Sequence, residues 1–272
     1  MYKSLAFIAL LSLPLGCSSS DTGPSDNSIV GSTNGQTNNG KQTNNAGTTN
    51  QNTTIDYSPY NGLLASYVDN AGQVDYISLK ANDSQALVDF VKDIGDTNLG
   101  DFSDDEKLAF YINAYNAIVL NQVVEAFPID SVMDISGFFD TQTHKVAGEI
   151  ITLDALENEI IRPTFDEPRV HFSLVCAAKS CPPLQKKAYR AEDLDATLSR
   201  VTTSFIVSQT SIVGKVVTTS KIFDWFGEDF VKASGSVGKF LGIYVPADKA
   251  ILEANDTQFE FSEYNWALNV QN

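Results

Sequence analysis

The chain has 272 residues, and 34 acidic side chains against 18 lysines and arginines give it a formal net charge of −16. A chain this acidic has no electrostatic route to nucleic acid or to an anionic membrane surface. The sequence contains no phosphate-binding glycine loop, dinucleotide fingerprint or HExxH motif, so no cofactor is expected.

The first segment, residues 1–16, predicts a lipoprotein signal peptide. Lys3 supplies a positive charge, and the apolar run that follows is too short to span a bilayer. The run ends in the letters LPLGC, which resemble the lipobox of bacterial lipoproteins. We therefore expect Cys17 to be acylated and to anchor the chain to a lipid bilayer of the cell envelope. Ser18 after the cysteine favours the outer membrane over the inner one. The alternative to a lipoprotein signal is an ordinary signal peptide that is cleaved elsewhere.

Residues 17–56 predict a disordered tether between the lipid anchor and the folded domain. This stretch consists almost entirely of Asn, Thr, Gly, Ser and Gln, so it cannot bury enough apolar surface to offset the entropy of ordering. As a flexible coil it would reach roughly 35 Å. From Tyr57 onward aromatic, aliphatic and charged residues are mixed, and we expect residues 57–272 to form a single globular domain.

The domain is expected to begin with a short helix over 63–68, a turn into a strand over 71–76 and a second helix over 84–94. The clearest helix follows, since Ser103-Asp-Asp-Glu106 fits a capping box and Pro128 ends the pattern. Apolar side chains point in nearly every direction around this helix, which predicts that it is buried.

Asn113 and Asn116 lie one turn apart on this helix, and burial would oblige their amides to find hydrogen-bond partners. Two interpretations follow. The amides either fix neighbouring loops, or one of them faces a functional site.

After a strand-like stretch over 145–151, Thr152 can cap a helix that runs to Arg162, with Pro163 ending it. Glu157 falls inside the apolar stripe of this helix. A carboxylate on an apolar face costs several kcal/mol unless it is paired. Its partner is expected to be His171, with Arg162 or Arg169 as alternatives.

Apolar and polar residues alternate over 170–176, which predicts a strand. In an extended strand Cys176 shares the apolar face and points away from His171. Cys176 is therefore interpreted as a small buried thiol. Cys181 follows a four-residue loop, Ala177–Ser180, that can bring its sulfur back beside His171.

A nucleophilic cysteine needs a base within hydrogen-bond reach, and the base needs an orienting acceptor. Cys181, His171 and Glu157 can fill these three roles, with Cys176 as the alternative thiol. Two other interpretations remain open. A Cys176–Cys181 disulfide would remove the thiol chemistry, and the histidine, the two cysteines and a carboxylate could bind a metal.

Five motifs taken together resemble family 547 of the domains of unknown function, over about residues 57–272: FYINAYN (110–116), LDALE (153–157), RVHFSLVCAAKSCPPL (169–184), SKIF (220–223) and YNWALN (264–269). The resemblance implies a papain-like or transglutaminase-like α+β fold with a proposed cysteine-hydrolase site. Carried over by position, that site would contain Glu157, His171 and one cysteine, with Asn113 or Asn116 nearby.

We therefore expect an α+β domain in which a small antiparallel sheet packs on a buried central helix. The expected activity is that of a thiol hydrolase acting on an amide or peptide bond in the cell envelope. The alternative is a non-catalytic envelope binding or scaffold module in which a Cys176–Cys181 disulfide is purely structural.

Overall fold

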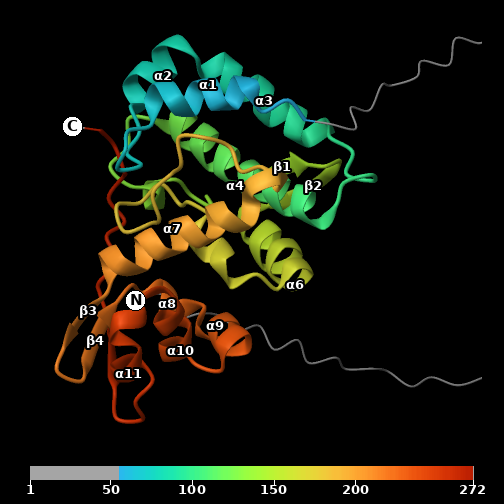
Figure 1. Ribbon diagram of the computed structural model, residues 1–272. Coiled ribbons are helices and arrows are strands. Elements are labelled where there is room, and N and C mark those ends of the chain that lie inside the picture. The colour runs from blue at the N-terminus through green and yellow to red at the C-terminus, as the bar shows by residue number, and fades with distance from the viewer. Residues whose placement is uncertain (1–54, 272) are drawn as a thin grey trace, which may run out of the picture. The chain divides into compact units, whose positions relative to one another are not determined.

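The structure, a computed structural model, describes residues 55–271 (Figure 1). The expected signal peptide (1–16), the expected lipidation site Cys17 and nearly all of the expected tether (17–56) lie outside these residues. Over 55–271 helices predominate and the strands are short, so the chain has the expected α+β class. None of the helices in this range is both long enough and apolar enough to cross a membrane.

The described chain begins with the helices α1 (Ser58–Tyr67), α2 (Tyr76–Asn82), α3 (Ser84–Asp96) and α4 (Asp104–Ala126). Three of them lie where the sequence predicts helices, but α2 begins where a strand was expected over 71–76. Asp75 accounts for the difference, because its carboxylate accepts a hydrogen bond from the Ser78 amide and so caps a helix. Only Val74 pairs in a strand-like manner, bridging Val68 and Val270.

Helix α4 is the buried centre of the first part of the fold. Its capping box is formed as predicted, because the Ser103 hydroxyl accepts from the Glu106 amide while the Glu106 carboxylate accepts from the Ser103 amide. Buried side chains occur on every side of the helix from Leu108 to Val124, which confirms the predicted burial.

The middle of the chain contains short elements and one long helix: η1 (Val132–Asp134), β1 (Thr143–Val146), β2 (Glu149–Thr152), α5 (Leu153–Ala155), η2 (Leu156–Ile161), α6 (Arg162–Phe165), η3 (Pro168–Phe172), η4 (Ala191–Asp193) and α7 (Leu194–Gln209). Strands β1 and β2 form an antiparallel hairpin whose first strand packs against α3. Its turn uses two residues in the left-handed region, Ala147 and Gly148.

The last part contains β3 (Ser211–Val213), β4 (Val216–Thr219), α8 (Ile222–Trp225), α9 (Gly227–Ser234), α10 (Val237–Tyr244), η5 (Pro246–Asp248), α11 (Lys249–Leu252) and β5 (Gln258–Phe261). Strand β4 pairs antiparallel with β3 and parallel with β5. The expectation of one antiparallel sheet is therefore wrong, since the strands form a separate hairpin and a mixed three-stranded sheet. The parallel pairing arises because the intervening helices α8–α11 return the chain to the other edge of β4.

Two groups of buried side chains hold these elements together. The first surrounds α4 and is mainly aliphatic. The second lies among α7–α11 and the three-stranded sheet, and it includes five phenylalanines: Phe172, Phe205, Phe223, Phe230 and Phe240. Figure 1 shows α1–α3 over α4 at one end, α8–α11 with β3 and β4 at the other, and α7 between them.

Candidate functional site

The predicted helix from Thr152 starts as expected but is not regular. The Thr152 hydroxyl accepts a hydrogen bond from the Ala155 amide at 3.1 Å, so this residue is the predicted N-cap. Residues Leu156–Ile161 then form a π-helix, in which the Arg162 amide bonds to the Glu157 carbonyl. Single π turns inside helices occur frequently at functional sites.

The predicted helix end at Arg162 is also wrong, because the chain continues helically through α6. Pro163 lies in the first turn of α6, a position that proline tolerates. Glu157 lies on the π-helix with its side chain only 14% exposed, so its carboxylate requires a partner inside the protein.

The predicted strand over 170–176 is not formed. Pro168–Phe172 is a short 3-10 helix, and the amides of Ser173 and Leu174 both donate to the Val170 carbonyl. Apolar residues at 170 and 174 fit a helical turn as well as a strand, and Pro168 together with the Glu167 cap favours the turn. The expectation that Cys176 and His171 lie on opposite faces of a strand therefore has no basis in the structure.

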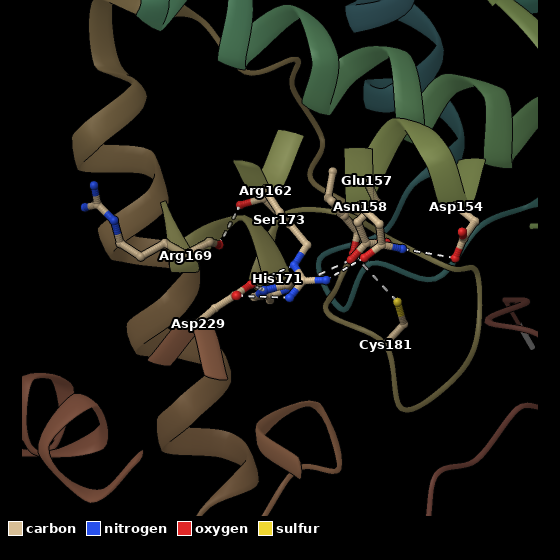
Figure 2. A network of polar contacts seen from close by, with 10 residues as sticks. Asp154, Glu157, Asn158, Arg162, Arg169, His171, Ser173, Cys181 and Asp229 are labelled. Carbon is tan, nitrogen blue, oxygen red and sulfur yellow. Dashed lines mark hydrogen bonds and ion pairs between the residues drawn. The ribbon is translucent and has the colours of Figure 1, made fainter. Parts of the chain in front are cut away.

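His171 lies between two carboxylates, and its side chain is fully enclosed. The ring atom Nε2 lies 2.8 Å from Oδ2 of Asp229, and Nδ1 lies 3.6 Å from Oε1 of Glu157 (Figure 2). The ring stacks on Phe226 with 3.9 Å between centroids and meets Phe230 edge-on. Glu157 and His171 form the predicted pair as an ion pair, but Nδ1 has no hydrogen-bond partner among the described residues. Asp229 is a second and closer partner that the sequence analysis missed.

The alternative partners proposed for Glu157 are engaged elsewhere. Arg162 binds Asp229 through two nitrogens, at 2.7 and 3.0 Å. Arg169 binds Glu167 and Asp195. Asp229 therefore receives both a guanidinium and an imidazole, and Arg162 also lies over the Phe226 ring that supports His171.

These contacts determine the charges at the site. Burial by itself lowers the pKa of His171, but the contacts with Asp229 and Glu157 outweigh it and raise the pKa above its ordinary value of 6.5. Burial raises the pKa of Asp229, yet the hydrogen bonds from His171 and Arg162 hold it well below the usual range. His171 is therefore held as an imidazolium between two carboxylates more readily than a free imidazole would be.

The two buried asparagines of α4 fix loops, as the first of the two interpretations predicts. The Asn113 side chain donates to the Tyr189 carbonyl and accepts from the Tyr189 amide. Asn116 does the same with two groups of the histidine segment, donating to the Ser173 carbonyl and accepting from the Val175 amide. Asn116 therefore positions the chain between His171 and the first cysteine.

The loop between the two cysteines is held by the C-terminal segment. The Lys179 amide donates to the Ala267 carbonyl, the Asn269 amide donates to the Ala177 carbonyl, and Ala178 bridges Leu268. Ala177 has φ of +59°, a left-handed conformation that turns the chain immediately after Cys176. Strained backbone of this kind is concentrated at functional sites.

Cys176 and Cys181 are both free and partly exposed. The Cys176 amide donates to Sγ of Cys181 at 2.7 Å, and Sγ of Cys176 lies 3.2 Å from the Tyr264 hydroxyl. Burial raises the pKa of both thiols, but hydrogen bonds from Cys181 and Tyr264 favour a thiolate on Cys176 and lower its pKa. Burial and that neighbouring thiolate in turn raise the pKa of Cys181 well above its usual value.

Aromatic side chains lie beside the sulfurs. Tyr264 packs against Trp266 with 4.7 Å between ring centroids and against Trp225 with 4.8 Å. Trp225 is 45% exposed, so this aromatic group extends from the thiols to the surface. Burial raises the pKa of Tyr115 well above its usual value, and the negative charge of Glu157 adds to this rise.

The structure therefore brings Glu157, His171 and the two cysteines into one region. Their order differs from the expected one, because Glu157 rather than His171 lies on the side of the cysteines. Figure 2 shows Cys181 pointing toward the side of the network that contains Glu157, with Asp229 on the far side of His171. Among residues 55–271 no hydrogen bond joins His171 to either sulfur, because both ring nitrogens face carboxylates. Asp229 lies 58 residues from His171 on a different helix, and Tyr264 88 residues from Cys176, so no local pattern identifies either contact.

The metal interpretation finds no support in the described part of the chain. No group of three or more His, Cys, Asp or Glu side chains there is arranged to hold a metal ion. Asn116 and the left-handed Ala177 instead fix the backbone on either side of Cys176.

Comparison with known proteins gives one result. No curated protein and no solved structure matches the chain. One family model matches a stretch that runs from the loop between α3 and α4 into α7. This stretch contains Glu157, His171 and both cysteines but neither Asp229 nor Tyr264. Residues 99–206 match the sequence model of the family described as "Protein of unknown function, DUF547", which confirms the predicted family resemblance over this stretch.

Proposed function

We propose that the protein is a thiol hydrolase that cleaves an amide or peptide bond in the cell envelope. The observation that carries the proposal is a pair of free, partly exposed cysteines near a buried imidazole that lies between two partly buried carboxylates. Perturbed titratable groups of this kind are concentrated at functional sites. A purely structural core would gain little from placing a buried histidine between two partly buried carboxylates.

The nucleophile in this proposal is one sulfur of the cysteine pair. The lowered pKa of Cys176 makes it the first candidate at neutral pH, with Cys181 as the second. This order reverses the expectation from the sequence, which rested on a strand that the structure does not contain. Tyr264 favours the thiolate by its hydrogen bond to Cys176.

The proton route follows from the order of the groups. The thiolate attacks the carbonyl carbon of the substrate, a C–S bond forms and the C–N bond breaks. The leaving amine takes up a proton that Glu157 and His171 pass on, since Glu157 lies on the cysteine side of the imidazole. Water then hydrolyses the thioester, which releases the carboxylic acid and restores the thiol. Asp229 acts as the orienting acceptor at Nε2, the role first expected for Glu157.

The papain-like or transglutaminase-like architecture that the family resemblance implies belongs to the same proposal. The buried helix α4, the small sheets and a thiol, a histidine and a carboxylate in one region support it. Envelope anchoring through Cys17 is likewise proposed from the sequence. Phase partition in a detergent tests it: the chain should enter the detergent phase, and a Cys17→Ser variant should remain in the aqueous phase.

Thiol titration tests the hydrolase. In a Cys17→Ser background, iodoacetamide labelling from pH 4 to 9 should modify Cys176 or Cys181 well below pH 8, with the modified residue identified by mass spectrometry. His171→Gln should slow this reaction, because the imidazolium no longer compensates the Glu157 charge. Asp195→Asn provides a control, since Asp195 is an exposed partner of Arg169.

The same experiment tests the non-catalytic scaffold, which one observation favours. The two cysteines are already in contact, so oxidation could join them. A mass two hydrogens below that of the dithiol, no labelling, and ordinary thiol reactivity after reduction would reject the hydrolase and support the scaffold.

A further inference from the structure

A concave site of about 500 Å³ lies after the cysteine segment, apart from the candidate site. It is lined by the chain over 183–190, by the turn at 69–70 and by the start of α7. No residue of the thiol, histidine or carboxylate group lines it, so the inference drawn from it is independent of the proposed hydrolase. Its volume is in the range of small-molecule sites.

The floor of this site is fixed by buried hydrogen bonds. Asn113 binds both backbone groups of Tyr189, and the Ala188 amide donates to the Asn61 side chain at 2.7 Å. Ala188 and Tyr189 are consequently buried, while the residues on either side of them are exposed. The segment is thus a rigid strip that presents its long charged side chains to the cavity.

These side chains are mainly cationic. Lys186, Lys187, Arg190 and Arg200 line the cavity, against the two carboxylates Asp69 and Asp193. The concentration of cations contrasts with the chain as a whole, in which acidic residues outnumber basic ones by 34 to 18.

The charged side chains of this cavity differ in how far they are satisfied within the protein. Oδ1 of Asp69 accepts hydrogen bonds from the amides of Ala71 and Gln73. Arg190 pairs with Glu192, whereas none of the ion pairs in the described chain involves Lys186, Lys187 or Arg200. Arg200 is held in place by a hydrogen bond to the neutral side chain of Gln185.

We propose that this cavity binds a small polar molecule that carries a phosphate-type anionic group. Arginine forks and lysine ammonium groups are the side chains that match phosphate oxygens. The amide and hydroxyl groups of Asn61, Asn70 and Thr197 line the same cavity and suit a hydrogen-bonding body. A long polyanion does not fit, because the acidic remainder of the surface would repel it.

Calorimetric titration of the full chain with inorganic pyrophosphate at low ionic strength tests the proposal. Binding near one equivalent is expected, and Arg200→Gln and Lys187→Gln should each weaken it by about tenfold. Lys187→Arg should retain most of the affinity. Lys239→Gln removes the same charge from an exposed position on α10 and should leave the affinity unchanged.

The absence of pyrophosphate binding, or an equal loss in Lys239→Gln, would overturn the proposal. If Arg200→Gln fails to fold, as judged by circular dichroism, the two Lys187 variants decide the question. Sedimentation of the Cys17→Ser chain with phosphatidylcholine vesicles, with and without phosphatidic acid, separates the two sources of phosphate. Binding that needs phosphatidic acid and Arg200 identifies a lipid headgroup, whereas pyrophosphate binding alone identifies a soluble compound.

Discussion

The two cores of the protein are built differently, and the candidate site lies where they meet. The core around α4 is large and mainly aliphatic, and its helices are adjacent in the sequence. The second core is small, depends on phenylalanine rings and takes Phe172 from a distant segment. Glu157 lies on an element packed against α4, whereas Asp229 belongs to α9 in the second region. His171, the neighbour of Phe172, therefore requires both cores for its two carboxylates.

The largest effect is expected from removing a ring of the second core. Phe230 is fully buried and contacts His171, Phe172, Phe223 and Phe240. Phe230→Ala should lower the free energy of unfolding by about 3–5 kcal/mol, because it leaves a cavity. It should also slow alkylation of the cysteine pair, since the imidazole loses support. Urea unfolding and iodoacetamide kinetics measure the two effects.

A matched variant in the first core separates stability from site geometry. Phe110 is equally buried but packs on Phe102 and Tyr111. Phe110→Ala should cost a similar free energy of unfolding and leave the alkylation rate of the folded protein unchanged. Equal slowing in both variants would mean that the two cores do not differ in their relation to the site.

A smaller loss of unfolding free energy is expected from Asp229→Asn, which neutralises the carboxylate that the second core places beside His171. His171 and Arg162 both lose a charged acceptor, so the free energy of unfolding should fall by about 2 kcal/mol. The pKa of His171 should fall as well, as followed by NMR of its ring protons. Asp224→Asn, which removes an exposed partner of Lys221, should change the free energy of unfolding by less than about 0.5 kcal/mol.

The first core contains a buried polar side chain whose replacement by an apolar one should stabilise the protein. Gln122 on α4 is buried, and neither polar atom of its amide has a hydrogen-bond partner among the described residues. Gln122→Met conserves the volume and should raise the free energy of unfolding by about 1 kcal/mol, because the burial of an unsatisfied amide is removed. A rise in the urea midpoint with an unchanged slope would establish this, whereas a decrease would show that the amide has a partner.

The smallest effect is a dependence of stability on pH. Because the pKa of His171 is raised on folding, its contribution is complete below about 6.5 and is lost as the pH rises through the folded pKa. Asp229 acts in the opposite sense, since its depressed pKa contributes above about 3.9 and is lost as the pH falls. Urea unfolding between pH 5 and 9 should show stability falling toward high pH, with a weaker fall in His171→Gln.

The sequence predicts well what depends on local patterns. Ser103 and Glu106 specify the start of α4, and the apolar residues around that helix specify its burial. The sequence also identifies Glu157 as a site residue, because a carboxylate inside an apolar stripe needs a partner and His171 is a suitable one. The family match over 99–206 agrees with the motifs found in that stretch.

What the sequence does not predict depends on long-range contacts or on ambiguous periodicity. Val170 and Leu174 fit a strand and a helical turn equally, and the wrong choice misplaced Cys176. Asp229 is one acid among many on a short helix, and only the folded chain brings it to His171. Tyr264 similarly reaches Cys176 because the C-terminal segment pairs with the cysteine loop.

The π-helix at Leu156–Ile161 determines how Glu157 and Arg162 are placed around the helix axis. A π turn amounts to an α-helix with one added residue, and each residue turns a helix by about 100°. A single-codon insertion there would rotate Glu157 relative to Arg162 without changing either residue. Deleting one residue between Glu157 and Arg162 should restore an ordinary α-helix. In that helix Glu157 could no longer reach His171 while Arg162 binds Asp229.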